Sequence, residues 1–188
     1  AEGPSAILKA SWQVEKWEGK SKPCTEGIHT REPVDCSGEA EAVMQRIADA
    51  NTEVLKLGKM PITIGGEHTV TYGVMRGFQQ AHADLRESYE GDRLSHACAM
   101  KRVVDLGIPL FQLGNRAYCE AEITTRKKHG VHYLDADELV PGNVGEFQLP
   151  DNFPENVFFT LDIDGMDPSV FPSTGTPVPG GLGWYQTL

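Results

Sequence analysis

The feature that most constrains the fold is the alternation of short apolar runs with helical stretches along the chain. The clearest apolar run covers residues 156–163, and further strand candidates are residues 60–64, 108–113 and 131–134. Apolar strands that alternate with helices predict a doubly wound α/β fold, in which helices cover both faces of a parallel sheet. In such sheets ligands bind beyond the carboxyl ends of the strands, so the polar residues there are the first candidates for chemistry.

Helices are predicted from the spacing of apolar side chains and from capping residues. Ser37 and Ser95 are predicted N-caps, and Gly58 and Gly107 follow two of the helices. The predicted helices cover residues 5–12, 37–58, 69–78, 96–105 and 120–129. Turn-rich composition predicts loops at residues 141–154 and 165–183.

The net charge restricts the partners of the chain. Its 188 residues include 17 Lys and Arg against 27 Asp and Glu, which gives a formal charge of −10. An acidic surplus argues against nucleic acid and against anionic membranes as partners, and it favours cations. No apolar run approaches the roughly 18 residues that span a bilayer. The four cysteines have no paired spacing, which favours reduced thiols and a cytoplasmic protein. The first residue is not Met, so a removed N-terminal targeting segment stays possible.

Three polar clusters at predicted strand ends contain residues that can bind metals. The first ends in His68, the second contains His82 and Asp84, and the third contains Asp162 and Asp164. In extended backbone, residues two apart lie on one face with Cα atoms about 6.6 Å apart. Two histidines and three aspartates suit Mn²⁺, with Fe²⁺, Co²⁺ and Zn²⁺ as alternatives. Such a set could hold two ions roughly 3.5–4 Å apart and activate a water for hydrolysis.

Each cluster also has a simpler interpretation. The string that ends in His68 could be an ordinary turn. His82 and Asp84 could be a chance pair in a surface loop, and Asp162 and Asp164 could form a solvated acidic turn. His96 follows the predicted N-cap Ser95, where the helix dipole favours a neutral imidazole that could pass a proton to a leaving amine. It could equally be a polar helix start. The combination of the clusters favours function, because two adjacent carboxylates after an apolar strand repel each other unless a cation binds them.

Several strings, in order along the chain, resemble the ureohydrolase family, the arginase and agmatinase group, and agmatinase more than arginase. They are Glu2-Gly3-Pro4 with Ala6-Ile7, Gly65-Gly66-Glu67-His68-Thr69, Ala81-His82-Ala83-Asp84-Leu85-Arg86, Ser95-His96-Ala97, Leu161-Asp162-Ile163-Asp164-Gly165-Met166-Asp167-Pro168 and Thr174-Gly175-Thr176-Pro177-Val178-Pro179-Gly180-Gly181-Leu182. The resemblance implies one domain over residues 1–188 with a three-layer αβα sandwich and a mainly parallel sheet, as in arginases and deacetylases. It also implies two Mn²⁺ ions with a bridging hydroxide that attacks a guanidinium carbon and releases urea.

The resemblance implies a role for each residue of the clusters. His68, Asp84 and Asp162 match the ligands of one ion, and His82, Asp162 and Asp164 match those of the other. Most family members are homo-oligomers, which implies the same for this chain.

Further matches concern catalysis and substrate. His96 matches the active-site histidine of the family, and we expect it to act in catalysis together with Asp84. Arg86 stands where arginase-like proteins carry an Asn that binds the substrate's α-carboxylate. The resemblance therefore implies a small cationic guanidino substrate without that group, such as agmatine, which would yield putrescine and urea.

The chain departs from the family pattern before His82. The family has an Asp that bridges both metals at the position of Gln80, and 13 residues between His68 and His82 are too few for a helix, a turn and a strand. We expect a segment to be missing between Gln80 and Ala81, either deleted or omitted. Both ends are also expected to be short, since the match begins after the family's first strand and stops at residues 184–188, before its later strands.

Three alternatives follow from these departures. The chain could be a non-catalytic ureohydrolase remnant that lacks the bridging Asp. It could hydrolyse another guanidino substrate, such as arginine or guanidinobutyrate. It could also be a single-metal Zn²⁺ amide hydrolase, as in the deacetylases of the same architecture, although the string from Thr174 to Leu182 argues against this.

Overall fold

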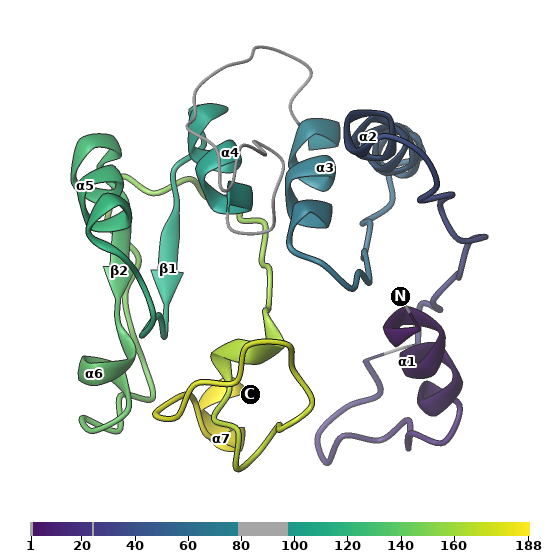
Figure 1. Ribbon diagram of the computed structural model, residues 1–188. Helices are drawn as coiled ribbons and strands as arrows, with labels where there is room; N and C mark the ends of the chain where they lie inside the picture. The colour runs from purple at the N-terminus through teal and green to yellow at the C-terminus, as the bar shows by residue number, and fades with distance from the viewer. Residues whose placement is uncertain (1, 24, 79–97) are drawn as a thin grey trace. The chain divides into compact units, whose positions relative to one another are not determined.

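The computed structural model describes residues 2–23, 25–78 and 98–188. The chain divides into two compact units, Ala1–Met100 and Lys101–Leu188, and each is described by itself. In chain order (Figure 1) the elements are α1 (Gly3–Ser11), α2 (Ala40–Lys56), α3 (Thr69–Phe78), α4 (Ala99–Asp105), β1 (Phe111–Leu113), α5 (Glu120–His129), β2 (His132–Leu134), α6 (Ala136–Leu139), the 3₁₀ turn η2 (Ile163–Gly165) and α7 (Trp184–Thr187).

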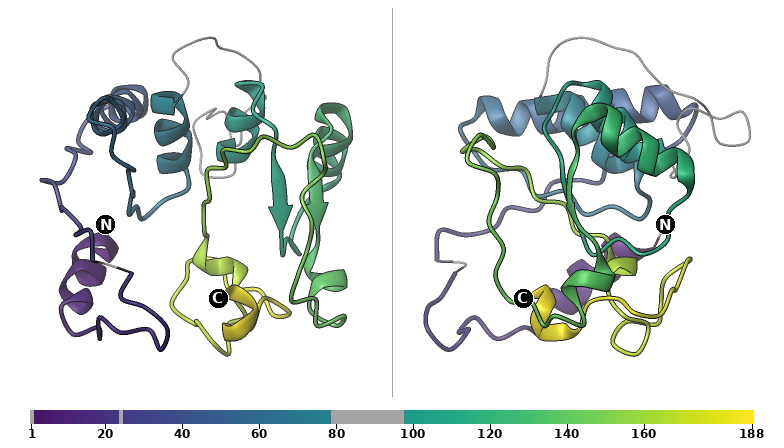
Figure 2. Two further views of the ribbon diagram at one scale, coloured as in Figure 1. Left: turned by 180° about the vertical axis from the view of Figure 1, so that it is seen from behind. Right: turned by 90° about the vertical axis from the view of Figure 1, so that its left-hand side faces the viewer.

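The core of the first unit lies between α2 and α3, which pack against each other with their axes crossing steeply (Figures 1 and 2). The close approach depends on Gly73 and Gly77 in α3. A Cβ on Gly77 would lie 2.7 Å from the Ala48 carbonyl oxygen, and one on Gly73 would lie 3.0 Å from the Ile47 Cβ. The face of α2 that is buried consists of Val43, Met44, Ile47, Ala48 and Asn51. Val43 and Ile47 belong to the apolar spacing that predicted this helix, since residues four apart share one side of a helix, whereas Leu57 of the same spacing is exposed.

The predicted start of α2 is wrong, and its predicted end is confirmed. Glu39, not Ser37, is the N-cap, and its side chain makes no capping hydrogen bond. The amide and hydroxyl of Ser37 instead donate to the Asp35 carboxylate, both at 2.9 Å. Asp35 therefore holds Ser37 in a local turn that precedes the helix. At the other end, Gly58 follows the helix with a φ of +67°, the left-handed conformation of a C′ glycine.

The second unit contains a parallel β1–α5–β2 arrangement, with α5 beside the two strands (Figure 2). Phe111 pairs with His132 and Leu113 with Leu134. Parallel strands need a crossover connection, and α5 provides it. The alternation of strands and helices predicted this unit, although β1 is shorter than expected. The short helices α6 and α7 are additional to the prediction.

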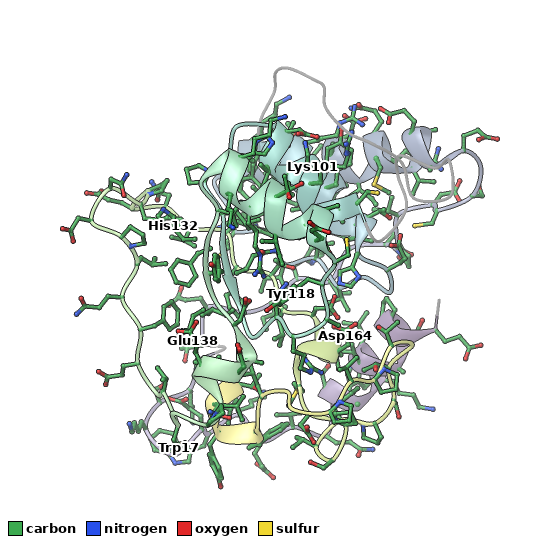
Figure 3. The ribbon with its side chains drawn as sticks, turned by 60° about the vertical axis from the view of Figure 1, so that its left-hand side comes forward. Trp17, Lys101, Tyr118, His132, Glu138 and Asp164 are labelled. Carbon is green, nitrogen blue, oxygen red and sulfur yellow. The ribbon has the colours of Figure 1, made fainter. Side chains whose placement is uncertain are left out.

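Arg126 connects α5 to the strands from a buried position. Its guanidinium donates to both carboxylate oxygens of Asp135, at 2.8 and 3.0 Å, and its Nε donates to Gln112 at 2.8 Å. The rings of Tyr118 and Tyr133 lie over the guanidinium at 4.9 and 4.6 Å; Tyr118 is labelled in Figure 3. The buried charge is therefore paired and hydrogen-bonded, as burial of a charge requires.

Two predicted strands are wrong. Within the part of the chain that the structure describes, residues 60–64 and 156–162 belong to no helix or strand, and Ile163 opens η2. The side chains of Met60 and Phe159 are largely exposed. An extended apolar segment becomes a strand only when a neighbour pairs with it. Among the described residues, no helix has both the length and the apolar character to cross a membrane.

Candidate metal centre

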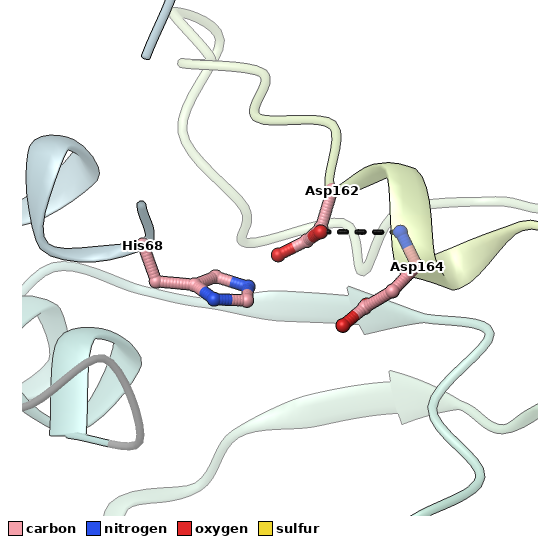
Figure 4. A group of neighbouring side chains, drawn as sticks. All are labelled: His68, Asp162 and Asp164. Carbon is pink, nitrogen blue, oxygen red and sulfur yellow. Dashed lines mark hydrogen bonds between the residues drawn. The ribbon is translucent and has the colours of Figure 1, made fainter. Parts of the chain in front are cut away.

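Asp162 and Asp164 lie at the start of a tight turn in the second unit. Asp162 has an extended backbone, with φ −96° and ψ 126°, and η2 begins at the next residue. The Asp164 amide donates to Asp162 Oδ1 at 3.2 Å, drawn as a dashed line in Figure 4. A carboxylate oxygen of each residue lies within 4.8 Å of one of the other. The structure therefore brings the two carboxylates together, on a turn rather than on the extended strand that was predicted.

The chemistry of this pair fits a divalent cation. Two carboxylates at this separation repel each other when both are ionised. The Thr176 hydroxyl donates to Asp164 Oδ2 at 2.7 Å and offsets part of this repulsion. Carboxylate oxygens are ligands that hard divalent cations accept, Mn²⁺ among them. The turn is thus suited to hold a cation between Asp162 and Asp164.

Asp167 follows Asp164 by three residues, and hydrogen bonds within the loop occupy its carboxylate. Its carboxylate accepts from the Ser169 hydroxyl at 2.6 Å and amide at 2.9 Å, and from the amides of Gly180 and Gly181 at 2.8 and 3.2 Å. These hydrogen bonds, the one from the Ser169 hydroxyl above all, stabilise the ionised form and lower the pKa of Asp167 to about 2. Asp167 therefore fixes the loop, and we do not count it among the metal ligands.

A second segment, residues 174–182, lies against the aspartate turn. Met166 and Leu182 form an isolated parallel bridge. The Asp167 amide donates to the Leu182 carbonyl at 2.9 Å, and the Leu182 amide donates to the Gly165 carbonyl at 3.0 Å. A Cβ on Gly181 would lie 2.6 Å from the Asp167 nitrogen, so this approach requires glycine. The contacts therefore explain the glycine at position 181 of this string.

His68 lies in the first unit, directly before α3. The Thr71 amide donates to the His68 carbonyl at 3.0 Å. The Glu67 carboxylate accepts from the Thr69 amide at 3.2 Å and from the Thr69 hydroxyl. The side chain of His68, drawn in Figure 4, is partly buried. His68 thus follows the apolar run of residues 60–64 and precedes a helix, as predicted.

The remaining predicted site residues lie outside the described part of the chain. These are His82, Asp84 and His96, together with the predicted N-cap Ser95. Their roles stay predictions.

Two residues beside the aspartates escaped the sequence reasoning. Thr176 contacts the Asp164 carboxylate, and Arg116 donates to the Asp164 carbonyl at 2.7 Å. The sequence holds a feature of each residue that points to the site. Thr176 belongs to the string that resembles ureohydrolases, and Arg116 stands three residues after β1, at the carboxyl end of a parallel strand, where sites are expected.

Comparison with protein families gives one match over the whole chain, since the model of the arginase family matches residues 1–188. An N(1)-aminopropylagmatine ureohydrolase of Synechocystis sp. is 35% identical over 208 residues, which cover 99% of this chain and 68% of that protein. An agmatinase of Pyrococcus horikoshii is 34% identical over 137 residues, which cover 69% of this chain and 47% of that protein.

Among solved structures, an agmatine ureohydrolase of Thermoplasma volcanium matches with a TM-score of 0.83 and 27% identity, over 99% of this chain and 68% of that one. This likeness confirms the predicted α/β fold class. The alignment of 208 positions with the Synechocystis protein is longer than the 188 residues of this chain, so gaps in this chain interrupt it. A missing segment between Gln80 and Ala81 stays a prediction.

Proposed function

The chain belongs to the arginase family, and from this membership we propose that it is a manganese-dependent ureohydrolase of a cationic guanidino amine. The observation that carries the proposal is the family match over residues 1–188, a range that includes all five proposed metal ligands. The aspartate turn supports it, because it holds two of the three proposed carboxylate ligands side by side.

The proposed metal centre has two ions. His68, Asp84 and Asp162 would bind one, and His82, Asp162 and Asp164 would bind the other. Imidazole nitrogens and carboxylate oxygens form a mixed set that suits Mn²⁺. When bound, the ions supply Lewis-acid activation of water for attack on a guanidinium carbon.

The protein residues would complete the reaction by positioning and proton transfer. Thr176 and the Asp164 amide hold the aspartate turn in place. We assign to His96 the transfer of a proton to the leaving amine nitrogen, with Asp84 as the second catalytic residue. The products are urea and the free amine.

Two substrates are candidates for this site. Agmatine, which yields putrescine, is favoured by Arg86, since the Asn that binds an α-carboxylate in arginase-like proteins is replaced there. N(1)-aminopropylagmatine is favoured by the name of the Synechocystis relative, whose alignment covers 99% of this chain. The net charge of −10 favours either cation over guanidinobutyrate.

The rival is a non-catalytic remnant. Helix α3 takes up ten of the 13 residues between His68 and His82, in line with the expectation that this stretch is too short for a helix, a turn and a strand. On this alternative the expected deletion before Ala81 includes the family's bridging Asp. Gln80, which stands at its position, is a neutral amide that binds a pair of dications poorly. On this alternative the chain binds fewer than two ions and releases no urea.

One experiment separates the two. The purified chain is loaded with Mn²⁺, its metal content is measured, and urea release is followed from agmatine, N(1)-aminopropylagmatine, arginine and guanidinobutyrate. The ureohydrolase proposal expects about two ions per chain and a higher kcat/KM for agmatine or N(1)-aminopropylagmatine than for the other compounds. D164N should lose the metal content and the urea release, and D137N, a matched change in α6, should keep them. One ion or none, with no urea from any compound, would establish the remnant.

We also propose a cytoplasmic homo-oligomer that has neither nucleic acid nor a membrane as partner. The acidic surplus supports the exclusion of both polyanions. Light scattering of the purified chain would test the assembly, and a monomeric mass at assay concentration would contradict it.

A further inference from the structure

Arg116 donates to backbone carbonyls of two separate segments beside the aspartates. On the aspartate turn it contacts the carbonyls of Asp164 at 2.7 Å and Met166 at 3.3 Å. On the segment of residues 174–182 it contacts the Val178 carbonyl twice, from Nη2 at 2.6 Å and from Nε at 2.9 Å. One side chain therefore ties together the two segments that shape the environment of Asp164.

The guanidinium is suited to this task by its geometry. It is planar and presents five N–H donors in a fixed fork, so it can serve carbonyls of two segments at once. The partly buried position of Arg116 strengthens each charge-assisted hydrogen bond. A lysine at this place would offer one nitrogen, and a glutamine would be shorter and uncharged.

The contacts determine how Asp164 presents its carboxylate. Arg116 fixes the Asp164 carbonyl, and Thr176 on the second segment fixes Asp164 Oδ2. Replacement of Arg116 removes the first restraint, and separation of the two segments then removes the second, so Asp164 can turn away from Asp162 under the repulsion of the like charges.

We propose that Arg116 is a positioning residue of the metal centre, which keeps the carboxylates of Asp162 and Asp164 aligned for a cation by joining the two segments through their carbonyls. The identity of the cation, Mn²⁺, rests on the proposed function, but the binding of Mn²⁺ tests Arg116 without turnover.

The test compares R116Q and R116K with the unaltered chain and with R46Q. Arg46 is a matched control, because it also donates to two backbone carbonyls, those of Asp35 and Ser37, in the first unit. The dissociation constant of Mn²⁺ is measured by electron paramagnetic resonance, and thermal midpoints are measured with and without Mn²⁺. We expect R116Q to weaken Mn²⁺ binding roughly 10-fold or more, R116K to weaken it less, and R46Q to leave it unchanged.

The thermal midpoints distinguish a role of Arg116 in positioning the carboxylates from a role in the stability of the fold alone. A positioning role reduces the rise in midpoint that Mn²⁺ causes. If the metal-free midpoint falls while this rise and the affinity stay as in the unaltered chain, Arg116 is structural and the proposal is overturned. If R116Q does not fold, a folded R116K with unaltered affinity overturns it equally. An unaltered chain that binds no Mn²⁺ overturns this proposal and the proposed function together, whereas one that binds Mn²⁺ but releases no urea contradicts the proposed function alone.

Discussion

At the scale of single residues, Asp167 gives the clearest dependence on pH. Its pKa is lowered from 3.8 to about 2 by the hydrogen bonds from Ser169, Gly180 and Gly181. Because the folded state holds the ionised form more strongly, Asp167 contributes stability above pH 3.8, and this is lost as the pH falls toward 2. We expect D167N to be less stable than the unaltered chain at pH 5 and to lose less stability between pH 4 and 2.

The measurement is urea unfolding, followed by circular dichroism at several pH values from 5 to 2. D151N, a change at an exposed loop aspartate, is the control. If the free energy of unfolding changes with pH in the same way for D167N and the unaltered chain across this range, the stabilising role assigned to ionised Asp167 is wrong.

The residues of the site differ in how far sequence could predict them. Asp162 and Asp164 are neighbours in sequence and in space, so their spacing was informative. Arg116 contacts carbonyls 48 and 62 residues further along, at Asp164 and Val178. Because a backbone carbonyl is present at every position, no residue type in the sequence indicates which ones an arginine will reach.

At the scale of elements, the packing of α3 on α2 depends on the absence of a side chain at Gly77. A methyl group there would lie 2.7 Å from the Ala48 carbonyl oxygen, so the two helices must move apart. We expect G77A to lower the free energy of unfolding by about 1–3 kcal/mol. G3A in α1, where nothing lies within 4 Å of the new methyl group, serves as the matched control and should not destabilise. Equal stability of the two variants in urea would contradict the predicted clash.

The buried pair of Arg126 and Asp135 joins α5 to the end of β2. Both side chains are more than nine-tenths buried, and each carboxylate oxygen accepts from the guanidinium. D135A leaves a buried charge unpaired and should cost about 3–5 kcal/mol in urea unfolding. The exposed neighbour Lys127 gives the control K127A, and the double change R126M/D135L should recover much of the loss. A loss of unfolding free energy in D135A that is no larger than in K127A would show that the pair of Arg126 and Asp135 does not stabilise the fold.

The elements also show which local patterns are reliable. Helix α5 was predicted with its observed bounds, because its hydrogen bonds join residues four apart and depend on nearby sequence. Residues 60–64 and 156–163 have the apolar character of strands, yet within the described residues neither is paired. Strand formation depends on a partner that is distant in sequence, and local composition does not supply it.

At the scale of the whole molecule, the proposed metal centre takes its ligands from distant parts of the sequence, and Mn²⁺ should therefore stabilise the chain as a whole. A ligand that binds the folded state alone contributes about 2.7 kcal/mol at 100 times its dissociation constant. We expect H68A to reduce this gain, since His68 is a proposed ligand of one ion, and D162A to remove it, since Asp162 is a proposed ligand of both ions. H29A, at an exposed histidine, should keep the full gain. The measurement is the free energy of unfolding in urea with and without Mn²⁺. If D162A removes the gain and H68A keeps it, the aspartates bind Mn²⁺ without His68, and the shared ion assigned to His68 and Asp162 is wrong.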